Sequence, residues 1–160
     1  MNIRDFLLFA APLLMTAPPL HASIPTSVKA GSQPSAELAG AERALEDFHQ
    51  ALRGGDKTAA LAMLADDALI YESGHAETKP EYAAHHLDAD IAFAKAVPGK
   101  TVRRRGESAS SLVWFTTEGR TTGTYKGKAV DRRTTETALL RSDAGKWVIV
   151  HLHWSSAASK

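Results

Sequence analysis

Two histidines near the end of the chain have a spacing that metal sites use. His151 and His153 lie two residues apart in KWVIVHLHWSS, where apolar residues alternate with others as in a strand. Residues two apart share one face of a strand, so both imidazoles are expected to point the same way. A structural zinc ion needs four ligands, and the residues predicted beside these histidines on the preceding strand are arginines and threonines. We therefore predict no metal site at this pair.

The same alternation divides the last strand into two faces. One face is uniformly apolar and is expected to pack under the helices; it consists of Val148, Val150, Leu152 and Trp154. The other face is expected to point outward, toward a second subunit, and consists of Trp147, Ile149, His151 and His153. We interpret the two histidines as interface residues that bind threonine side chains or backbone groups.

Glu136 is the first candidate for acid/base chemistry. Alternation places it with Thr134, Ala138 and Leu140, a group expected to face the interior. Burial raises the pKa of a carboxyl group unless a cation or hydrogen-bond donors compensate, and such acids are common in catalytic clefts. The alternative is a structural glutamate that is paired with an arginine or with backbone donors.

His86 and Asp90 are the second candidates. They lie four residues apart in a segment predicted to be helical, where side chains at this spacing are neighbours. A carboxylate that orients an imidazole is what a general base requires, although a surface ion pair or a satisfied core histidine shows the same pattern. Tyr82 shares the more apolar stripe with His86, and Glu72 ends a predicted strand. We expect both to line a pocket together with Trp154.

Composition excludes several classes of function. The 160 residues carry 19 basic and 18 acidic side chains, a net charge of +1, without the concentrated basic footprint of a nucleic-acid-binding protein. The one basic run, Arg103 to Arg105, lies in a predicted strand that sends its members to opposite faces. The absence of cysteine excludes disulfides and thiolate metal sites. No pattern calls for a cofactor.

The N-terminal residues have the pattern of a secretory signal. A short polar start with Arg4 precedes an apolar stretch from Phe6 to Met15, and small residues and prolines follow. This stretch is too short to span a membrane as a helix. We expect a signal peptide over 1–22, a flexible linker over 23–34, and an exported protein that would be periplasmic in a bacterium with two membranes.

The rest of the chain must position these residues, and its first half is predominantly helical. A helix with Ser35 as its N-cap and a second one from Asp56 carry apolar residues at three- and four-residue spacing. A strand over 68–73 and a loop over 73–80 follow. Pro80 is well placed to start a third helix.

Beyond Gly99 the sequence changes to strand-like segments. Thr, Val, Trp, Phe and Tyr alternate with polar residues, and breaks fall at Gly106, at 123–127 and at 142–145. This predicts three or four antiparallel strands. Helices followed by such a sheet indicate an α+β fold with helices against one sheet face.

The closing hairpin resembles the nuclear transport factor 2-like superfamily. The motif is a T-E-T strand at 135–137, a D-x-G-K-W turn at 143–147 and a strand ending in H-x-H-W-S at 151–155, with an aromatic–Glu pair at Tyr71-Glu72. The nearer relatives are the SnoaL-like and DUF4440-type domains and the association domain of calcium/calmodulin-dependent protein kinase. The resemblance covers 35–156, leaving a tail at 157–160. It implies a cone-shaped, curved antiparallel or mixed sheet packed against N-terminal helices, an internal pocket and usually a homodimer.

The resemblance implies no single activity, because the superfamily includes isomerases, cyclases, dehydratases, transport adaptors and oligomerisation hubs. The association domain carries pocket arginines at positions that align with Ala138 and Trp154, so its anion binding is not expected here. We expect an exported protein that binds a small molecule, with acid/base isomerase, dehydratase or hydratase chemistry left open. The alternatives are a non-catalytic dimerisation or adaptor module and a periplasmic metal-handling protein.

Overall fold

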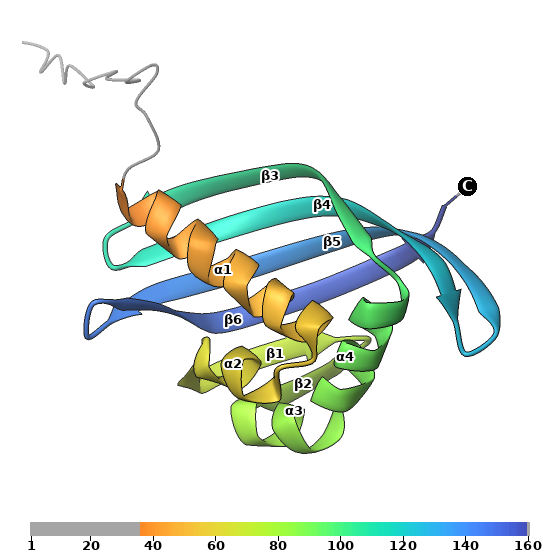
Figure 1. Ribbon diagram of the computed structural model, residues 1–160. Helices are drawn as coiled ribbons and strands as arrows, with labels where there is room; N and C mark the ends of the chain where they lie inside the picture. Colours follow the sequence, from red (N-terminus) through yellow and green to blue (C-terminus); the bar gives the residue numbers. More distant parts are fainter. Residues whose placement is uncertain (1–35, 160) are drawn as a thin grey trace, which may run out of the picture. The chain divides into compact units, whose positions relative to one another are not determined.

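The computed structural model describes residues 36–159 (Figure 1). Along the chain the helices come first and most of the strands follow, as predicted. The predicted signal peptide, the linker and the cap at Ser35 lie outside the described residues. None of the described helices is long and apolar enough to cross a membrane.

Two helices open the fold. α1 (Ala36–Gly54) buries one stripe of side chains and is followed by Gly55, whose φ of +77° favours glycine. Asp56 caps α2 (Lys57–Ala62) by accepting a hydrogen bond from the backbone N–H of Ala59 at 2.9 Å. The buried stripe of α1 consists of Ala41, Ala44, Leu45, Phe48, Ala51 and Leu52.

The predicted third helix is in fact two helices. α3 (Lys79–His85) begins with a capping box between Thr78 and Glu81. α4 (Leu87–Ala96) follows after a break at His86. Tyr82 and Leu87 are both buried, yet five residues in an uninterrupted helix would point them about 140° apart. The break at His86 lets both side chains reach the core, so the prediction of one continuous helix was wrong.

Six strands form one mixed sheet in the order β2-β1-β6-β5-β4-β3. All neighbours are antiparallel except β1 and β6, which are parallel. β6 continues two residues past the predicted end of the domain at Ser156. The strands are β1 (Leu64–Glu72), β2 (His75–Thr78), β3 (Gly99–Ala109), β4 (Leu112–Tyr125), β5 (Lys128–Asp143) and β6 (Lys146–Ala158).

Two predictions about breaks between the strands were wrong. The segment His75–Thr78 is a strand rather than a loop, because positive φ at both Ser73 and Gly74 closes a tight hairpin with β1. Gly106 lies inside β3 rather than at a break. A Cβ there would come within 2.4 Å of the Phe115 ring, so glycine is needed to let that ring pack.

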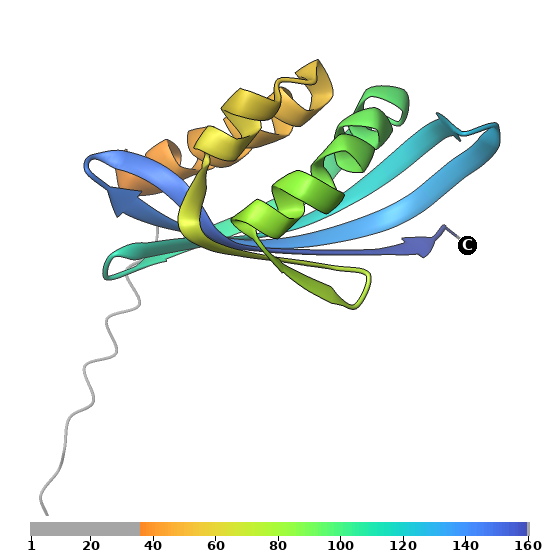
Figure 2. The same cartoon turned by 90° about the horizontal axis from the view of Figure 1, so that it is seen from below.

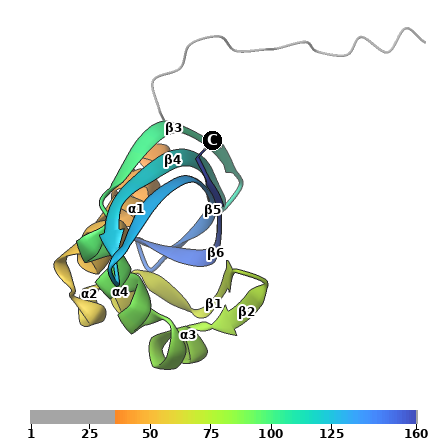
Figure 3. The same ribbon diagram turned by 90° about the vertical axis from the view of Figure 1, so that its right-hand side faces the viewer.

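The helices cover one face of the curved sheet, which we call the inner face; the other is the outer face (Figures 2 and 3). The core lies between the helices and this inner face. Its most deeply buried sheet residues are Val113, Phe115, Ala138, Leu140, Ile149 and Leu152.

A β-bulge at Val150 changes the faces of the last strand. Leu140 pairs with Ile149 and Leu139 with His151, which leaves Val150 without a partner on β5. The extra residue shifts the alternation by one, so Ile149 faces inward and is fully buried. The Trp147 indole also lies inside, against α1 at Gly40. The prediction that Trp147 and Ile149 form an outer interface was therefore wrong.

Beyond the bulge the predicted faces hold. Leu152 is fully buried and Trp154 packs against the core, so both lie on the inner face. His151 and His153 lie on the outer face beside Tyr71. Val148 and Val150, which were predicted to be core residues, are only partly buried at its margin.

Candidate functional site

A row of side chains with polar groups crosses the inner face where the hydrophobic core ends. Register partners across the six strands share one face, and this row takes one residue from each strand. We call it the polar row: Arg104, Thr117, Glu136, Trp154, Glu72 and His75. The adjoining inner-face row, two residues along, is fully buried and apolar in its centre, at Phe115, Ala138, Leu152 and Ile70.

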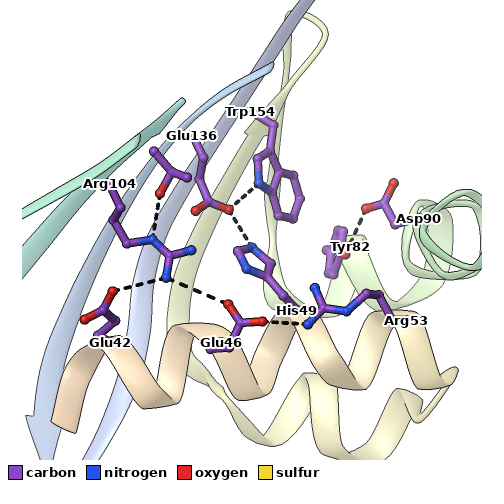
Figure 4. Close-up of polar contacts among 10 residues, drawn as sticks. Glu42, Glu46, His49, Arg53, Tyr82, Asp90, Arg104, Glu136 and Trp154 are labelled. Carbon is purple, nitrogen blue, oxygen red and sulfur yellow. Dashed lines mark hydrogen bonds and ion pairs between the residues drawn. The ribbon is translucent and has the colours of Figure 1, made fainter. Parts of the chain in front are cut away.

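Glu136 is the most buried acid of the polar row, with only 8% of its surface exposed. One carboxylate oxygen, Oε2, lies 2.7 Å from Nε2 of His49 on α1 and accepts a hydrogen bond of 2.7 Å from the Trp154 indole (Figure 4). The other oxygen, Oε1, is buried and has no hydrogen-bond partner among residues 36–159. Glu136 therefore faces inward as predicted, and its main partner comes from a helix 87 residues away.

The environment of Glu136 favours its ionised form. Burial alone would raise the pKa of this carboxyl group. The hydrogen bond and charge of His49, the Trp154 indole and the more distant Arg104 guanidinium outweigh burial and hold the pKa below its usual value. Arg104 itself donates to the Thr117 hydroxyl at 3.1 Å and lies 3.5 Å from Glu42. Glu136 is thus a paired carboxylate rather than the proton-carrying acid that burial alone predicted.

Aromatic rings separate Glu136 from the second polar group of the site. The Trp154 ring stacks on Phe48 at 6.2 Å between centroids, with an interplanar angle of 15°. The fully buried Tyr82 ring also lies near this indole, 6.5 Å away between centroids. Phe48, Trp154 and Tyr82 form an apolar wall from α1 to α3 that we call the aromatic wall.

Asp90 on α4 lies at the far end of this wall. Its Oδ2 accepts a hydrogen bond of 2.9 Å from the Tyr82 hydroxyl (Figure 4). Burial and the nearby charge of Glu72 raise the pKa of Asp90 to about 6, although the Tyr82 hydrogen bond and His86 oppose the change. Burial also raises the pKa of Tyr82, which stays a neutral donor. A carboxyl group that titrates near neutral pH can both take and give a proton.

His86 is oriented by a carboxylate, but not by the predicted one. Its Nδ1 lies 2.7 Å from Glu77 on β2, whereas Asp90 influences it only through charge. The hydrogen bond and charge of Glu77 raise the pKa of His86. Glu72 lies close enough to interact electrostatically with both residues, and burial raises its pKa as well. The predicted pairing of His86 with Asp90 was wrong because the β1–β2 hairpin supplies a nearer acid.

The predicted site residues therefore form two groups linked by the aromatic wall. Glu136 belongs to one group, and Glu72, Tyr82, His86 and Asp90 belong to the other, with Trp154 between them. Sequence reasoning missed His49 and did not pair Glu77 with His86. A signal for His49 was present, since it follows Leu45 by four residues and precedes Leu52 by three on the apolar stripe of α1. Within residues 36–159, no three His, Asp or Glu side chains are placed to hold a metal ion.

The outer face carries a different set of aromatic and apolar residues. The Tyr71 ring lies 5.1 Å from His151 and 6.3 Å from His153, and Leu69 is their neighbour on β1. Leu69 and Tyr71 are 42% and 38% exposed, high values for large apolar side chains on a sheet. Burial and the adjacent His153 lower the pKa of His151, which keeps it neutral near pH 7. We call these four residues the outer patch.

Two surface grooves lie away from both groups. One, of about 300 Å³, runs between α1 and the start of β6 beside Trp147 and Arg43. The other, of about 610 Å³, lies over β4, β5 and β6 and is lined by Arg120, Arg133 and several Ser and Thr residues. Neither groove is lined by residues of the aromatic wall or by Asp90.

Comparison with known proteins places the chain in a family. A family model described as a SnoaL-like domain matches residues 41–159. The crystal structure of a proposed ketosteroid isomerase from Shewanella frigidimarina is 35% identical, with a TM-score of 0.70 over 72% of this chain and 94% of that one.

More distant structures share the fold. A proposed calcium/calmodulin-dependent kinase II association domain from Exiguobacterium sibiricum is 16% identical, with a TM-score of 0.64 over 81% of this chain and 100% of that one. A proposed dehydratase of the NTF2-like family from Streptomyces avermitilis is 14% identical, with a TM-score of 0.68 over 79% and 100%. No curated protein matches. The chain belongs to the SnoaL-like family, and its helices on a curved mixed sheet are the NTF2-like α+β fold.

Proposed function

We propose that this protein binds a small apolar molecule and moves a proton on it, as an acid/base isomerase does. The observation that supports this proposal is the environment of Asp90. This partly buried carboxyl group accepts a hydrogen bond from Tyr82 and has a pKa raised to about 6. Such a group is divided between its acid and its base form near neutral pH, which is the condition for efficient proton transfer. The similar protein from Shewanella frigidimarina, described as a ketosteroid isomerase, supports this class of reaction.

The chemistry follows from the surroundings of Asp90. Its carboxylate form removes a proton from a carbon next to a ligand carbonyl, and the C–H electron pair becomes part of an enolate. The protonated Asp90 then returns the proton to another carbon of the conjugated system, so no atoms are gained or lost. Trp154, the partly buried ring of the aromatic wall, offers an apolar surface for such a substrate, and the fully buried Phe48 and Tyr82 hold it in place. The charge of Glu72 raises the pKa of Asp90, and a higher pKa makes the Asp90 carboxylate a stronger base.

The test is an isomerisation assay with a 3-oxo-Δ5-steroid, followed by the ultraviolet absorbance of the conjugated product. The wild type should convert the steroid faster than buffer does, and Asp90→Asn should lower kcat by about 100-fold or more because it removes the proton carrier. Asp88→Asn is the matched control, since Asp88 lies on the same helix but is exposed and pairs with Lys57. Equal rates for wild type and Asp90→Asn would overturn the assignment of Asp90.

A second function, self-association, is supported by the outer patch. Leu69 and Tyr71 expose apolar surface beside two imidazoles, and contiguous patches of this kind are common in protein interfaces. Several structures with the same fold are described as association or hub domains. We infer a homodimer through the outer patch, in place of the interface that was predicted to include Trp147 and Ile149.

Light scattering after size exclusion tests the dimer. The wild type should elute with twice the mass of one chain, and Tyr71→Asp should give a monomer because it buries a charge in the interface. Val102→Asp is the control, since Val102 is 69% exposed on β3, outside the patch. A monomeric wild type at micromolar concentration would contradict the proposal.

We also propose that the protein is exported. The polar start, apolar stretch and small residues before Ala22 support a cleaved signal peptide. Mass spectrometry of the protein from its native host should then show an N-terminus at Ser23. An intact Met1 in the native protein would contradict export by this route.

A further inference from the structure

One buried oxygen of Glu136 is shared by two donors while the other has none. Oε2 lies 2.7 Å from both His49 Nε2 and Trp154 Nε1. Oε1 is enclosed and unpaired among the described residues. Buried polar groups in native proteins are almost always paired. Both hydrogen bonds to this carboxylate therefore end on one oxygen, Oε2, which accepts from the imidazole and from the indole.

The geometry determines which nitrogen of His49 carries a proton. An indole N–H can only donate and an ionised carboxylate can only accept, so Nε2 of His49 must donate its hydrogen to Glu136. In the neutral imidazole, Nδ1 then holds the free lone pair. His49 makes no hydrogen bond through Nδ1 to the described residues, and Nδ1 is not among their buried unpaired atoms. The side chain is 19% exposed, so a solute can approach this nitrogen.

We propose that His49 is a second proton-transfer residue of this site, with Nδ1 as the general base and Glu136 as the positioning residue. This rests on the proposed function, because it gives a second proton carrier to the same reaction. His49 and Asp90 lie at opposite ends of the aromatic wall, linked through Trp154 and Tyr82. Groups at two positions can serve two distant carbons of a rigid, conjugated substrate.

One proton leaves the substrate in this step and one proton is returned to it. In this form of the reaction Nδ1 of His49, in place of the Asp90 carboxylate, takes a proton from a C–H next to a ligand carbonyl. The electron pair of that bond moves into the conjugated system, and Asp90 takes part in its protonated form. The resulting imidazolium is stabilised by the Glu136 carboxylate, which stays ionised. Protonated Asp90 gives its proton to the distant carbon, and water returns both residues to their first states.

The same contacts indicate a neutral ligand. The cation nearest to the dyad, Arg104, is already engaged by Thr117 and by the charges of Glu42 and Glu46. The ionisable side chains that act on Tyr82 and Asp90 are Glu72, Glu77 and His86, so acids outnumber the one imidazole at this end of the wall. Among the described residues an anionic ligand would meet mostly acids there, whereas a neutral polycyclic or aromatic ketone would meet the partly buried Trp154 ring.

Alkylation with bromoacetamide tests the base without any substrate. A ring nitrogen displaces bromide, and the chain has no cysteine to compete. Peptide mass spectrometry locates the product, and amino-acid analysis distinguishes Nδ1-alkylated from Nε2-alkylated histidine. His49 should react at Nδ1, and Glu136→Gln should slow this reaction about fivefold or more, because a neutral amide no longer fixes the hydrogen on Nε2 and the ring then loses its single tautomer and orientation.

His85, which is 65% exposed, is the internal control and should react equally in both proteins. If Glu136→Gln does not fold by circular dichroism, Glu136→Asp serves instead, since it keeps the charge but moves it away from Nε2. Alkylation of His49 at Nε2, no alkylation of His49, or a rate that is unchanged in the variant overturns the proposal. Isomerase activity with unreactive His49 would leave Asp90 as the proton carrier. Reactive His49 without steroid turnover would instead reject only the proposed reaction.

Discussion

The hydroxyl group of Tyr82 donates a hydrogen bond of 2.9 Å to the carboxylate of Asp90, across the break between α3 and α4. Tyr82 is fully buried and Asp90 only partly. The pair therefore joins the core to a partly exposed acid with a raised pKa.

Removing the hydroxyl should raise the pKa of Asp90. In Tyr82→Phe the carboxylate loses the hydrogen bond that lowers its pKa, while burial and Glu72 continue to raise it. We expect Asp90 to titrate above pH 6 in carboxyl-carbon NMR, and the free energy of unfolding at pH 7 to fall by about 1–3 kcal/mol, as for a lost hydrogen bond to a charged group. An unchanged titration of Asp90 would show that the hydrogen bond does not form in solution.

Neutralising Asp90 should stabilise the protein at high pH. Its pKa is about 6 in the folded state and 3.8 in the unfolded state, so folding favours the protonated form. The stabilising contribution of protonated Asp90 is therefore fully present below about pH 4 and is lost as the pH rises through 6.

Asp90→Asn removes this loss and should unfold at higher urea concentration than the wild type at pH 8, by about 2 kcal/mol. At pH 4 the two proteins should differ little. Asp88→Asn should show no such gain, because Asp88 is exposed. A variant less stable than the wild type at pH 8 would contradict the raised pKa.

Two glycine substitutions should act in opposite directions. Gly106→Ala places a Cβ 2.4 Å from the fully buried Phe115 ring and 3.0 Å from Leu38, so it should destabilise the fold by about 1–3 kcal/mol. Gly54→Ala meets no atom within 4 Å at the end of α1, and it should stabilise by about 0.5–1 kcal/mol through the unfolded chain. Urea denaturation of both variants measures the difference. Equal stabilities would mean that Phe115 can move aside.

Glu77 should control the titration of His86. The Glu77 carboxylate raises the pKa of this imidazole mainly through its hydrogen bond. In Glu77→Gln, the His86 resonance in a histidine NMR titration should move to lower pH. The stabilising effect of this pair is present at low pH and is lost as the pH rises through the folded-state pKa of His86.

Glu81→Gln is the control for this titration, because Glu81 binds Thr78 and not His86. A shift of equal size in both variants would indicate a general effect of negative charge rather than the specific contact.

Local periodicity predicted much of the architecture. The apolar stripe of α1, the positions of the long strands and the inward faces of Glu136, Leu152 and Trp154 follow from spacings within single segments. The closing hairpin also resembled the family to which the chain belongs. These features are set by nearby residues, so a reading of the chain alone can find them.

The sequence by itself thus determined the fold class, the family and the presence of acids and imidazoles on inward positions. Only the tertiary structure decided their partners. The bulge at Val150 turned Trp147 and Ile149 inward, and the β1–β2 hairpin brought Glu77 to His86. The packing of α1 on the sheet brought His49 to Glu136 across 87 residues. Strand register, bulges and helix placement depend on how distant segments pack together, and no local spacing encodes those contacts.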